Sequence, residues 1–457
     1  MANSKNSRGN GSNHKKSSNN SREKKSGSRD YGTILFRVIG IELVVVACLV
    51  GFGIYHYAGP MLGEAVNQIF GKKTPGNPTD NMTMYTEDLP TLAPVQQSTE
   101  AQTEGEKEPA VVRITALGDN LMQSSCVLSG QQPDGSFSFD RHFSNIQPLL
   151  AKADIGIISQ DTVAGGSELG LSEKNVLNAP YELADAMKAA GINVVLAANN
   201  HILDKGKQGV VNMINCWSQR CPDAVLAGVN ASVEQKVLPV YIESKGVKIA
   251  ILNYTDVALN SEELTAEPYL VNYYDKNWIT NIMEEARKEA DFVIVFPFWG
   301  QQDNLNITAD QENQAKLLAD LGADLIIGNY PHVVEPVKWI TASDGREVLV
   351  YYSLGNFQSN QSSLQNMLGA AANVEITKTD EGTSITDYDF DFIVTHYQVE
   401  GSADYYNIVT TYLLDDYSEE LASRHGLVVS GTDTEFSIAG LQGLGSQILQ
   451  KCELKDE

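Results

Sequence analysis

The chain carries TADQENQAKLLADLGADLIIGNYPH at residues 308–332, and this stretch contains the unit that decides the predicted fold. Its first part, 308–321, has the apolar spacing of an amphipathic helix, and an apolar strand, ADLIIGNY, follows at 323–330. Polar residues, among them Asn329 and His332, come where the strand ends. A helix followed by an apolar strand with a polar end is the repeating unit of α/β proteins.

The same unit recurs on both sides of this stretch. Further strands are predicted at 111–119, 154–159, 192–199, 224–229, 247–255, 291–300 and 347–356, and further helices at 181–190, 208–219 and 277–289. Continuous apolar strands between amphipathic helices indicate parallel strands that are covered on both faces. Near the end of the chain, 371–377 and 386–398 predict an antiparallel pair around a turn at 379–382.

The N-terminal part of the chain has a different character. Residues 1–33 are rich in Ser, Asn and Lys, and 34–57, ILFRVIGIELVVVACLVGFGIYHY, are long and apolar enough to span a bilayer. Lys and Arg crowd the N-terminal side, which predicts a cytoplasmic tail. No convincing cleavage site follows, so an uncleaved signal anchor is expected. Residues 58–110 form a juxtamembrane segment and a Pro/Thr/Glu-rich stalk, and 111–457 form the domain outside the cell membrane.

The net charge of the chain argues against nucleic acid as a binding partner. The net charge is −25, and the first thirty residues contribute about +6, so the remainder is strongly acidic. A domain of this kind is a poor nucleic-acid binder, because such binding depends on basic patches. Five cysteines do not make a disulfide framework. Cys216 and Cys221 could pair in an oxidising compartment or remain free thiols.

Polar side chains gather where the predicted strands end. In an open α/β sheet, sites form beyond the carboxyl ends of the strands. The residues at these ends are Asp119, Asp161, Asn199, Asn200, His201, Asp204, His332 and Asn356. Carboxylates together with imidazoles and amide oxygens suit Mn, Fe or Zn.

These motifs, in this order, resemble the CapA family, which is named for capsule and poly-γ-glutamate synthesis. LAANNHILDKG at 196–206 is similar to the family's "ANNHxxDxG", GADLIIGNYPHVVEPV at 322–337 to "GADxIxGxHPHVxQP", and YYSLGNF at 351–357 to "YSLGNF". The resemblance covers about 111–357. It implies a metallophosphatase-like α/β sandwich.

By position, the resemblance also implies roles for these residues. It makes His201 a general acid or base, and places Asn199, Asp204 and Asn356 in a substrate pocket. The implied metal ligands are Asp119, Asp161, Asn200 and His332. Two histidines of the family pattern are replaced here, by Phe298 and Tyr330. A phenyl ring cannot bind a metal, and a phenol does so only when it is deprotonated or strongly activated. We therefore expect one divalent cation (Mn, Zn or Fe) or none.

Two functions follow from the resemblance and the replaced histidines. In the first, the chain is a binding or scaffold subunit with a degenerate metal site, whose partners are the membrane, other subunits of a polymer synthase complex and a cell-surface polymer. In the second, it is an active metal-dependent phosphoesterase-type hydrolase acting on a cell-envelope substrate. The lost imidazoles favour the first, because two bridged metals need more ligands than remain.

Overall fold

The computed structural model describes residues 109–257, 261–399 and 408–455. The predicted cytoplasmic tail (1–33), the predicted membrane segment (34–57) and all but the end of the predicted stalk (58–110) lie outside these ranges. Within them, no helix combines the length and the apolar character that a membrane span requires.

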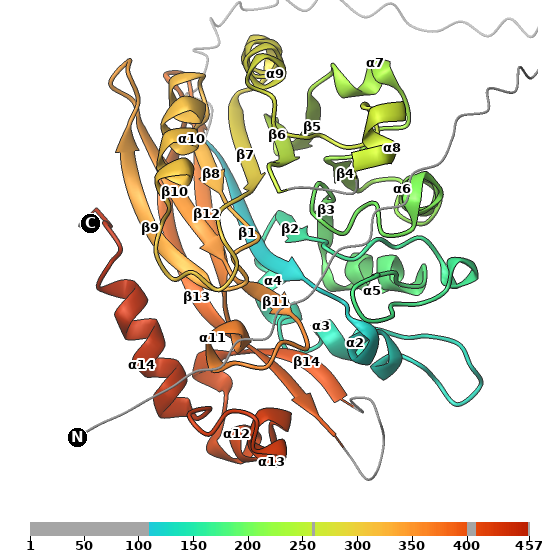
Figure 1. Ribbon diagram of the computed structural model, residues 1–457. Coiled ribbons are helices and arrows are strands. Elements are labelled where there is room, and N and C mark those ends of the chain that lie inside the picture. The colour runs from blue at the N-terminus through green and yellow to red at the C-terminus, as the bar shows by residue number, and fades with distance from the viewer. Residues whose placement is uncertain (1–108, 258–260, 400–407, 456–457) are drawn as a thin grey trace, which may run out of the picture. The chain divides into compact units, whose positions relative to one another are not determined.

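The described residues fold around two β-sheets (Figure 1). The first sheet has the strand order β14-β13-β12-β1-β2-β3-β4, and the short strand β11 also pairs with β1. Its strands are β1 (Ala110–Asn120), β2 (Ile155–Ser159), β3 (Ile192–Leu196), β4 (Val225–Ala227), β11 (Asn356–Gln358), β12 (Leu368–Thr379), β13 (Gly382–Gln398) and β14 (Ile408–Leu413).

The second sheet has the order β5-β6-β7-β8-β10-β9. Its strands are β5 (Val240–Ser244), β6 (Val247–Thr255), β7 (Phe292–Phe298), β8 (Leu325–Ile327), β9 (Val334–Thr341) and β10 (Glu347–Leu354). In both sheets the central strands are parallel, namely β1 to β4 in the first and β6, β7, β8 and β10 in the second. Antiparallel strands flank them.

Alternate residues of the second sheet face two different apolar layers. On β7, Phe292, Ile294 and Phe296 belong to one large core cluster with residues of the first sheet. Val293 and Val295 belong to a second cluster, with residues of α9 (Lys276–Glu289) and α10 (Ala309–Asp320). Side chains of a strand alternate between the faces of its sheet. The two sheets therefore pack face to face, and helices cover the outside of the second one.

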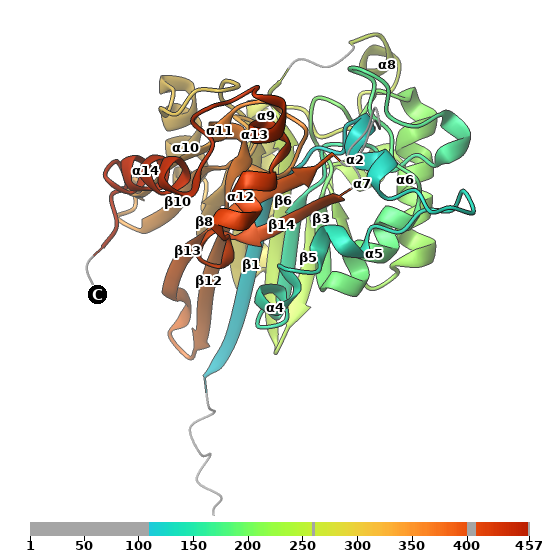
Figure 2. The same cartoon turned by 90° about the horizontal axis from the view of Figure 1, so that it is seen from below.

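The remaining helices lie around the first sheet, beside β9 of the second sheet and near the described C-terminal end of the chain (Figures 1 and 2). The two long ones near β2 to β4 are α5 (Glu182–Ala190), which ends on the left-handed Gly191, and α6 (Gly206–Arg220). The shorter ones are α2 (Ser124–Ser129), α3 (Asp140–Phe143), α4 (Gln147–Leu150), α7 (Val233–Lys236), α8 (Ser261–Ala266), α11 (Leu364–Met367), α12 (Glu419–Arg424), α13 (Gly426–Ser430) and α14 (Ile438–Leu449), with 3₁₀ turns at Ser167–Leu169 and Leu414–Asp416.

The mixed α/β fold predicted from the sequence is confirmed, and each predicted strand and helix is present within a few residues of its expected bounds. The antiparallel pair predicted at 371–398 is present as β12 and β13. The inner face of each sheet is covered by the other sheet. Cys216 and Cys221 are buried free thiols, whose sulfurs lie against the carbonyl oxygens of Tyr181 and Ala184.

Candidate metal centre

Asp119 lies near the carboxyl end of β1, where the chain crosses the turn after β10. Its backbone N–H donates to the carbonyl oxygen of Gly355 over 2.9 Å, and it pairs in parallel with Asn356 of β11. This approach requires the glycine before it, because a Cβ on Gly118 would lie 2.0 Å from that same carbonyl oxygen. The carboxylate of Asp119 is fully buried.

His332 is presented by the loop after β8, in which the backbone is strained. Tyr330 has φ 99° and His332 has φ 58°, on either side of Pro331. Non-glycine residues in this region cost free energy and gather at functional sites. The strained loop points two donors at one oxygen, since the Tyr330 N–H lies 3.1 Å and the His332 Nδ1 3.0 Å from Oδ2 of Asp119.

Asp161 follows β2 and is also fully buried. The hydroxyl of Ser159 donates to its Oδ1 over 3.1 Å. Desolvation, and then the nearby charge of Asp119, raise the pKa of the Asp161 carboxyl well above its usual value, whereas the Ser159 bond opposes this shift. The two carboxylates thus lie close together, with no Lys or Arg ion-paired to either among the described residues.

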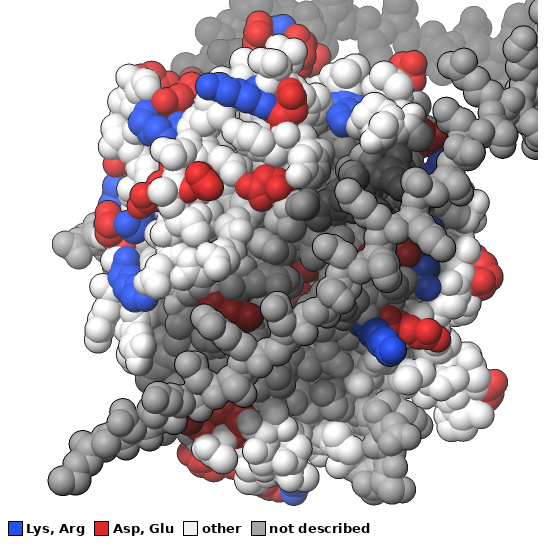
Figure 3. Space-filling view, viewed as in Figure 1, with Lys and Arg blue, Asp and Glu red and all other residues white. Residues whose placement is uncertain are grey.

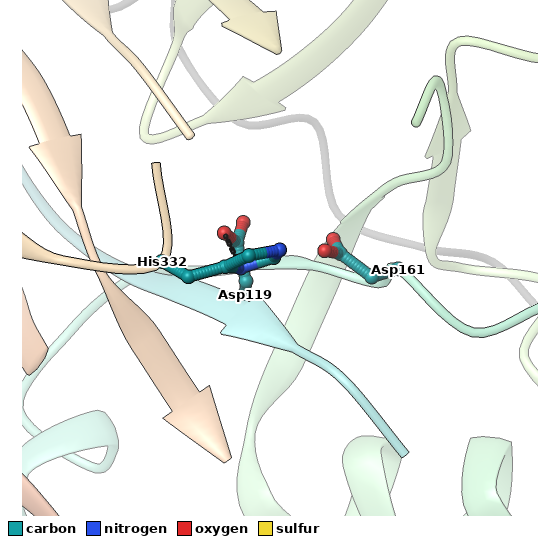
Figure 4. A group of neighbouring side chains, drawn as sticks. All are labelled: Asp119, Asp161 and His332. Atoms are coloured by element: carbon teal, nitrogen blue, oxygen red, sulfur yellow. Dashed lines mark ion pairs between the residues drawn. The ribbon is translucent and has the colours of Figure 1, made fainter. Parts of the chain in front are cut away.

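The three side chains form a compact group (Figure 4). Asp119, Asp161 and His332 each offer one ligand atom, and these atoms lie within 4.8 Å of one another. Oδ1 of Asp119, Oδ2 of Asp161 and Oδ1 of Asn200 are buried and have no hydrogen-bond partner within the part of the chain that the structure describes. All three atoms are acceptors, and leaving buried acceptors unpaired is costly. A cation would satisfy the two carboxylate oxygens, so Asp119, Asp161 and His332 fit a single metal ion.

Two aromatic rings stand beside this group. The ring centroids of Phe298 and Tyr330 lie 5.0 Å apart, and those of Tyr330 and His332 lie 5.8 Å apart. Phe298 is buried at 1% exposure, whereas Tyr330 is half-buried. Of the two positions at which the resemblance expects histidine, Tyr330 is a neighbour of His332 and Phe298 is a neighbour of Tyr330, and they offer a phenol and a phenyl ring instead of imidazoles.

The segment after β3 holds the other predicted residues. Nδ1 of His201 lies 2.8 Å from Oδ2 of Asp204, and both side chains keep about a fifth of their surface exposed (20% and 17%). Asn199 is buried, and its amide donates to the carbonyl oxygens of Gln160 and Ala197 while accepting from the His201 N–H. These bonds join the segment to the residue before Asp161. The predicted pocket roles of Asn199 and Asp204 stay predictions, as does the ligand role of Asn200.

One acidic residue near the site was not singled out from the sequence. Asp256 directly follows β6, and its backbone N–H donates to the carbonyl oxygen of Phe298. Its carboxylate accepts from Gln314 over 2.6 Å, and burial raises its pKa. Desolvation, followed by the charge of Asp256, raises the pKa of Tyr330. The same strand-end rule that selected Asp119 would have found Asp256.

Comparison with known proteins agrees with these motifs. The model of the family described as bacterial capsule synthesis protein PGA_cap matches residues 113–361. The chain is 29% identical over 252 residues to the PGA biosynthesis protein CapA of Bacillus subtilis (strain 168), a match that covers 53% of this chain and 63% of that protein. It is 30% identical over 296 residues to the capsule biosynthesis protein CapA of Bacillus anthracis, covering 62% of this chain and 67% of that protein. The chain thus spans less than two thirds of the length of the B. subtilis relative.

A solved structure resembles the chain more distantly. The crystal structure of a novel phosphatase from Mycoplasma pneumoniae aligns with a TM-score of 0.41 at 14% identity, over 62% of this chain and 94% of that one. A similarity at this level carries no argument about the chemistry of the site.

Proposed function

The chain belongs to the family of bacterial capsule synthesis proteins PGA_cap, and from this premise we propose that it serves the synthesis of a capsule polymer such as poly-γ-glutamate as a binding or scaffold subunit. The relatives in B. subtilis and B. anthracis carry the words PGA and capsule biosynthesis in their names, which supports the choice of polymer. The proposed location is outside the cell membrane, on a single-pass anchor at 34–57, next to other subunits of the synthase.

The residues that make up the candidate metal centre favour a binding role over a catalytic role. Asp119, Asp161 and His332 can hold one cation, whereas Phe298 and Tyr330 put carbon and a weak oxygen donor where further imidazoles would stand. Hydrolysis of phosphoesters by two metals needs both to be held about 3.5–4 Å apart by a full ligand set. We therefore propose a site for one Mn²⁺, Zn²⁺ or Fe²⁺.

Charge supports a role for that cation in binding an anionic polymer. On the face shown in Figure 3, Lys and Arg side chains lie scattered and mostly next to acidic ones. Among the described residues, several Lys and Arg side chains are ion-paired, as in Arg287–Asp324 at 2.6 Å and Lys245–Asp154 at 2.7 Å. The described residues visible in Figure 3 form no continuous basic patch that would hold a polyanion. When bound, a divalent cation supplies positive charge that this acidic domain otherwise lacks.

The second candidate function, a phosphoesterase-type hydrolase, is favoured by one observation. Asp204 accepts from His201 over 2.8 Å, and the imidazole remains partly exposed. A carboxylate that orients a histidine in this way is a common arrangement for a general acid or base. Asp204 also accepts the Leu177 N–H over 2.6 Å, so its position is fixed.

One set of measurements on the purified full-length protein separates the two functions. Metal content, hydrolysis of p-nitrophenyl phosphate and of its bis ester, and binding of poly-γ-glutamate would be measured for wild type and for Asp119→Ala. Asp134→Ala, which removes an exposed carboxylate, serves as the matched control. The binding role predicts polymer binding that depends on added Mn²⁺ and on Asp119, without hydrolysis. Metal-dependent hydrolysis lost in both Asp119→Ala and His201→Ala would establish the hydrolase instead.

A further inference from the structure

The orientation of the Asn356 amide is fixed by its surroundings. Its Nδ2 lies 2.6 Å from Oε1 of Gln361, 3.0 Å from the carbonyl oxygen of Asn366 and 3.1 Å from Oγ of Ser359. Two of these three atoms can only accept hydrogen bonds. An amide turned the other way would place its oxygen against those oxygens. The NH₂ end must therefore face them, and Oδ1 must face the opposite side.

On that opposite side, Oδ1 of Asn356 lies 3.0 Å from Nδ1 of His332. An amide oxygen can only accept, so Nδ1 must carry the proton. The other near atom of Nδ1 is Oδ2 of Asp119 at 3.0 Å, which also accepts. Asn356 and Asp119 thus share one N–H. Both residues and His332 are buried, with 0–1% of their surface exposed.

We propose that Asn356 is a positioning residue that holds the proton of His332 on Nδ1 and keeps Nε2 as the free nitrogen of the neutral ring. Figure 4 shows this second nitrogen pointing toward Asp161, the side on which the proposed cation binds. This inference rests on the proposed cation site for its purpose, but not for its geometry. It differs from the substrate contact expected for Asn356, because this amide is fully buried, its NH₂ group faces acceptors inside the protein and its oxygen faces His332.

The tautomer of His332 can be read directly from the full-length protein. Long-range ¹H–¹⁵N correlation spectra of ¹⁵N-histidine-labelled protein distinguish Nδ1–H from Nε2–H, and His332→Gln identifies the signal. Wild type, without metal, should show Nδ1–H. Asn356→Ala removes one of the two acceptors of Nδ1–H and leaves Asp119, so the fraction of the Nε2–H tautomer of His332 should rise above that of wild type. Asn178→Ala removes another fully buried asparagine, bonded only to residues 165, 166, 170 and 172, and should change nothing.

Affinity for Mn²⁺ provides a second readout. Loss of an orienting partner of a metal-bound histidine commonly lowers metal affinity 10- to 100-fold, so Asn356→Ala should weaken Mn²⁺ binding by about that factor. An Nε2–H signal in wild type, or an unchanged tautomer in folded Asn356→Ala, overturns the proposal. The wild-type spectrum decides the matter even if the alanine variant does not fold. Absence of Mn²⁺ binding in a wild type that shows Nδ1–H would refute the cation site and leave the positioning role intact.

Discussion

The ring centroids of Phe298 and Tyr330 lie 5.0 Å apart, although one residue ends β7 and the other belongs to the loop after β8. Strands β7 and β8 are adjacent and parallel, so their carboxyl ends meet at one edge of the second sheet. There the ring of Tyr330 also adjoins the imidazole of His332. Positions 298 and 330, which belong to different motifs, therefore lie side by side in the fold. The effect of placing histidine at both can be tested.

The double variant Phe298→His with Tyr330→His should bind Mn²⁺ or Zn²⁺ at least tenfold more tightly than wild type, a gain of about 1.4 kcal/mol. Each new nitrogen can join Asp119, Asp161 and His332 around one ion. Histidine also tolerates the positive φ of position 330 better than most residues. Calorimetry on both proteins measures the gain, and Asp119→Ala in the double variant should abolish it. An unchanged affinity in a folded double variant would mean that these positions do not face the cation.

Glu335→Gln should stabilise the protein at alkaline pH. Burial raises the pKa of Glu335 to about 8, against an opposing bond from Gln311 over 2.6 Å, and its Oε1 has no partner. Because the folded pKa exceeds the unfolded one, the wild type loses stability as pH rises from about 4.5 to about 8.

Each pKa unit corresponds to about 1.4 kcal/mol, so the variant should gain a few kcal/mol at pH 9 and little at pH 4.5. Denaturant unfolding at both pH values measures the difference. Gln311→Ala removes the hydrogen-bond donor to Glu335 but keeps the Glu335 carboxyl. It should therefore not reduce the pH dependence of the unfolding free energy. Equal pH dependence in wild type and Glu335→Gln would show that Glu335 is already ionised in the folded protein.

His396→Gln should reduce the loss of unfolding free energy that the protein undergoes as the pH falls. Desolvation, assisted by the charge of Arg424, lowers the pKa of His396 to about 4, and its Nδ1 lies 2.6 Å from the hydroxyl of Tyr417. The folded pKa is below the unfolded one, so the stability that the neutral ring provides is lost as pH falls from about 6.5 to about 4. Unfolding free energies at pH 7 and pH 4.5 should differ less in the variant. Gln398→Ala removes a neighbour at 2.9 Å without removing a titrating group and should leave the difference unchanged.

Protease added to intact cells should remove the domain that begins near residue 110 while leaving the first thirty residues protected. The reason is the basic tail that precedes the apolar run at 34–57. Immunoblots against an N-terminal and a C-terminal tag report the two halves separately, and permeabilised cells provide the control in which both are cut. Recovery of the intact chain from the cytosolic fraction would contradict the anchored topology.

Much of the fold could be predicted because its strands are short apolar runs that end on polar residues. The sequence could not show how these strands divide between two sheets. On β7 every residue from Phe292 to Phe298 is buried, and such a run fits a strand covered by helices equally well as one covered by a second sheet. Strands β5 and β9 were missed because they are partly exposed and lack the continuous apolar pattern.

The candidate site was predicted to a similar degree. The motif residues Asp119, Asp161 and His332 are brought together, because Asp119 lies near the carboxyl end of β1 and the other two follow the parallel strands β2 and β8. The positioning role proposed for Asn356 could not be predicted from the motif, because it depends on which atoms surround the side-chain amide. Asp256 was missed although it obeys the rule used for the others.

The close approach of Gly118 and Gly355 joins a strand that is synthesised early to a turn that is synthesised late. Asp119 lies on the first strand of the domain, and its partner Tyr330 comes 211 residues later. A nascent chain can therefore form most of its helices before the candidate metal centre is assembled, and closing so long a loop is slow. Until Tyr330 and His332 have been made and placed beside β1, Oδ2 of Asp119 lacks both of its donors. Acquisition of metal would then mark the end of folding rather than guide its beginning.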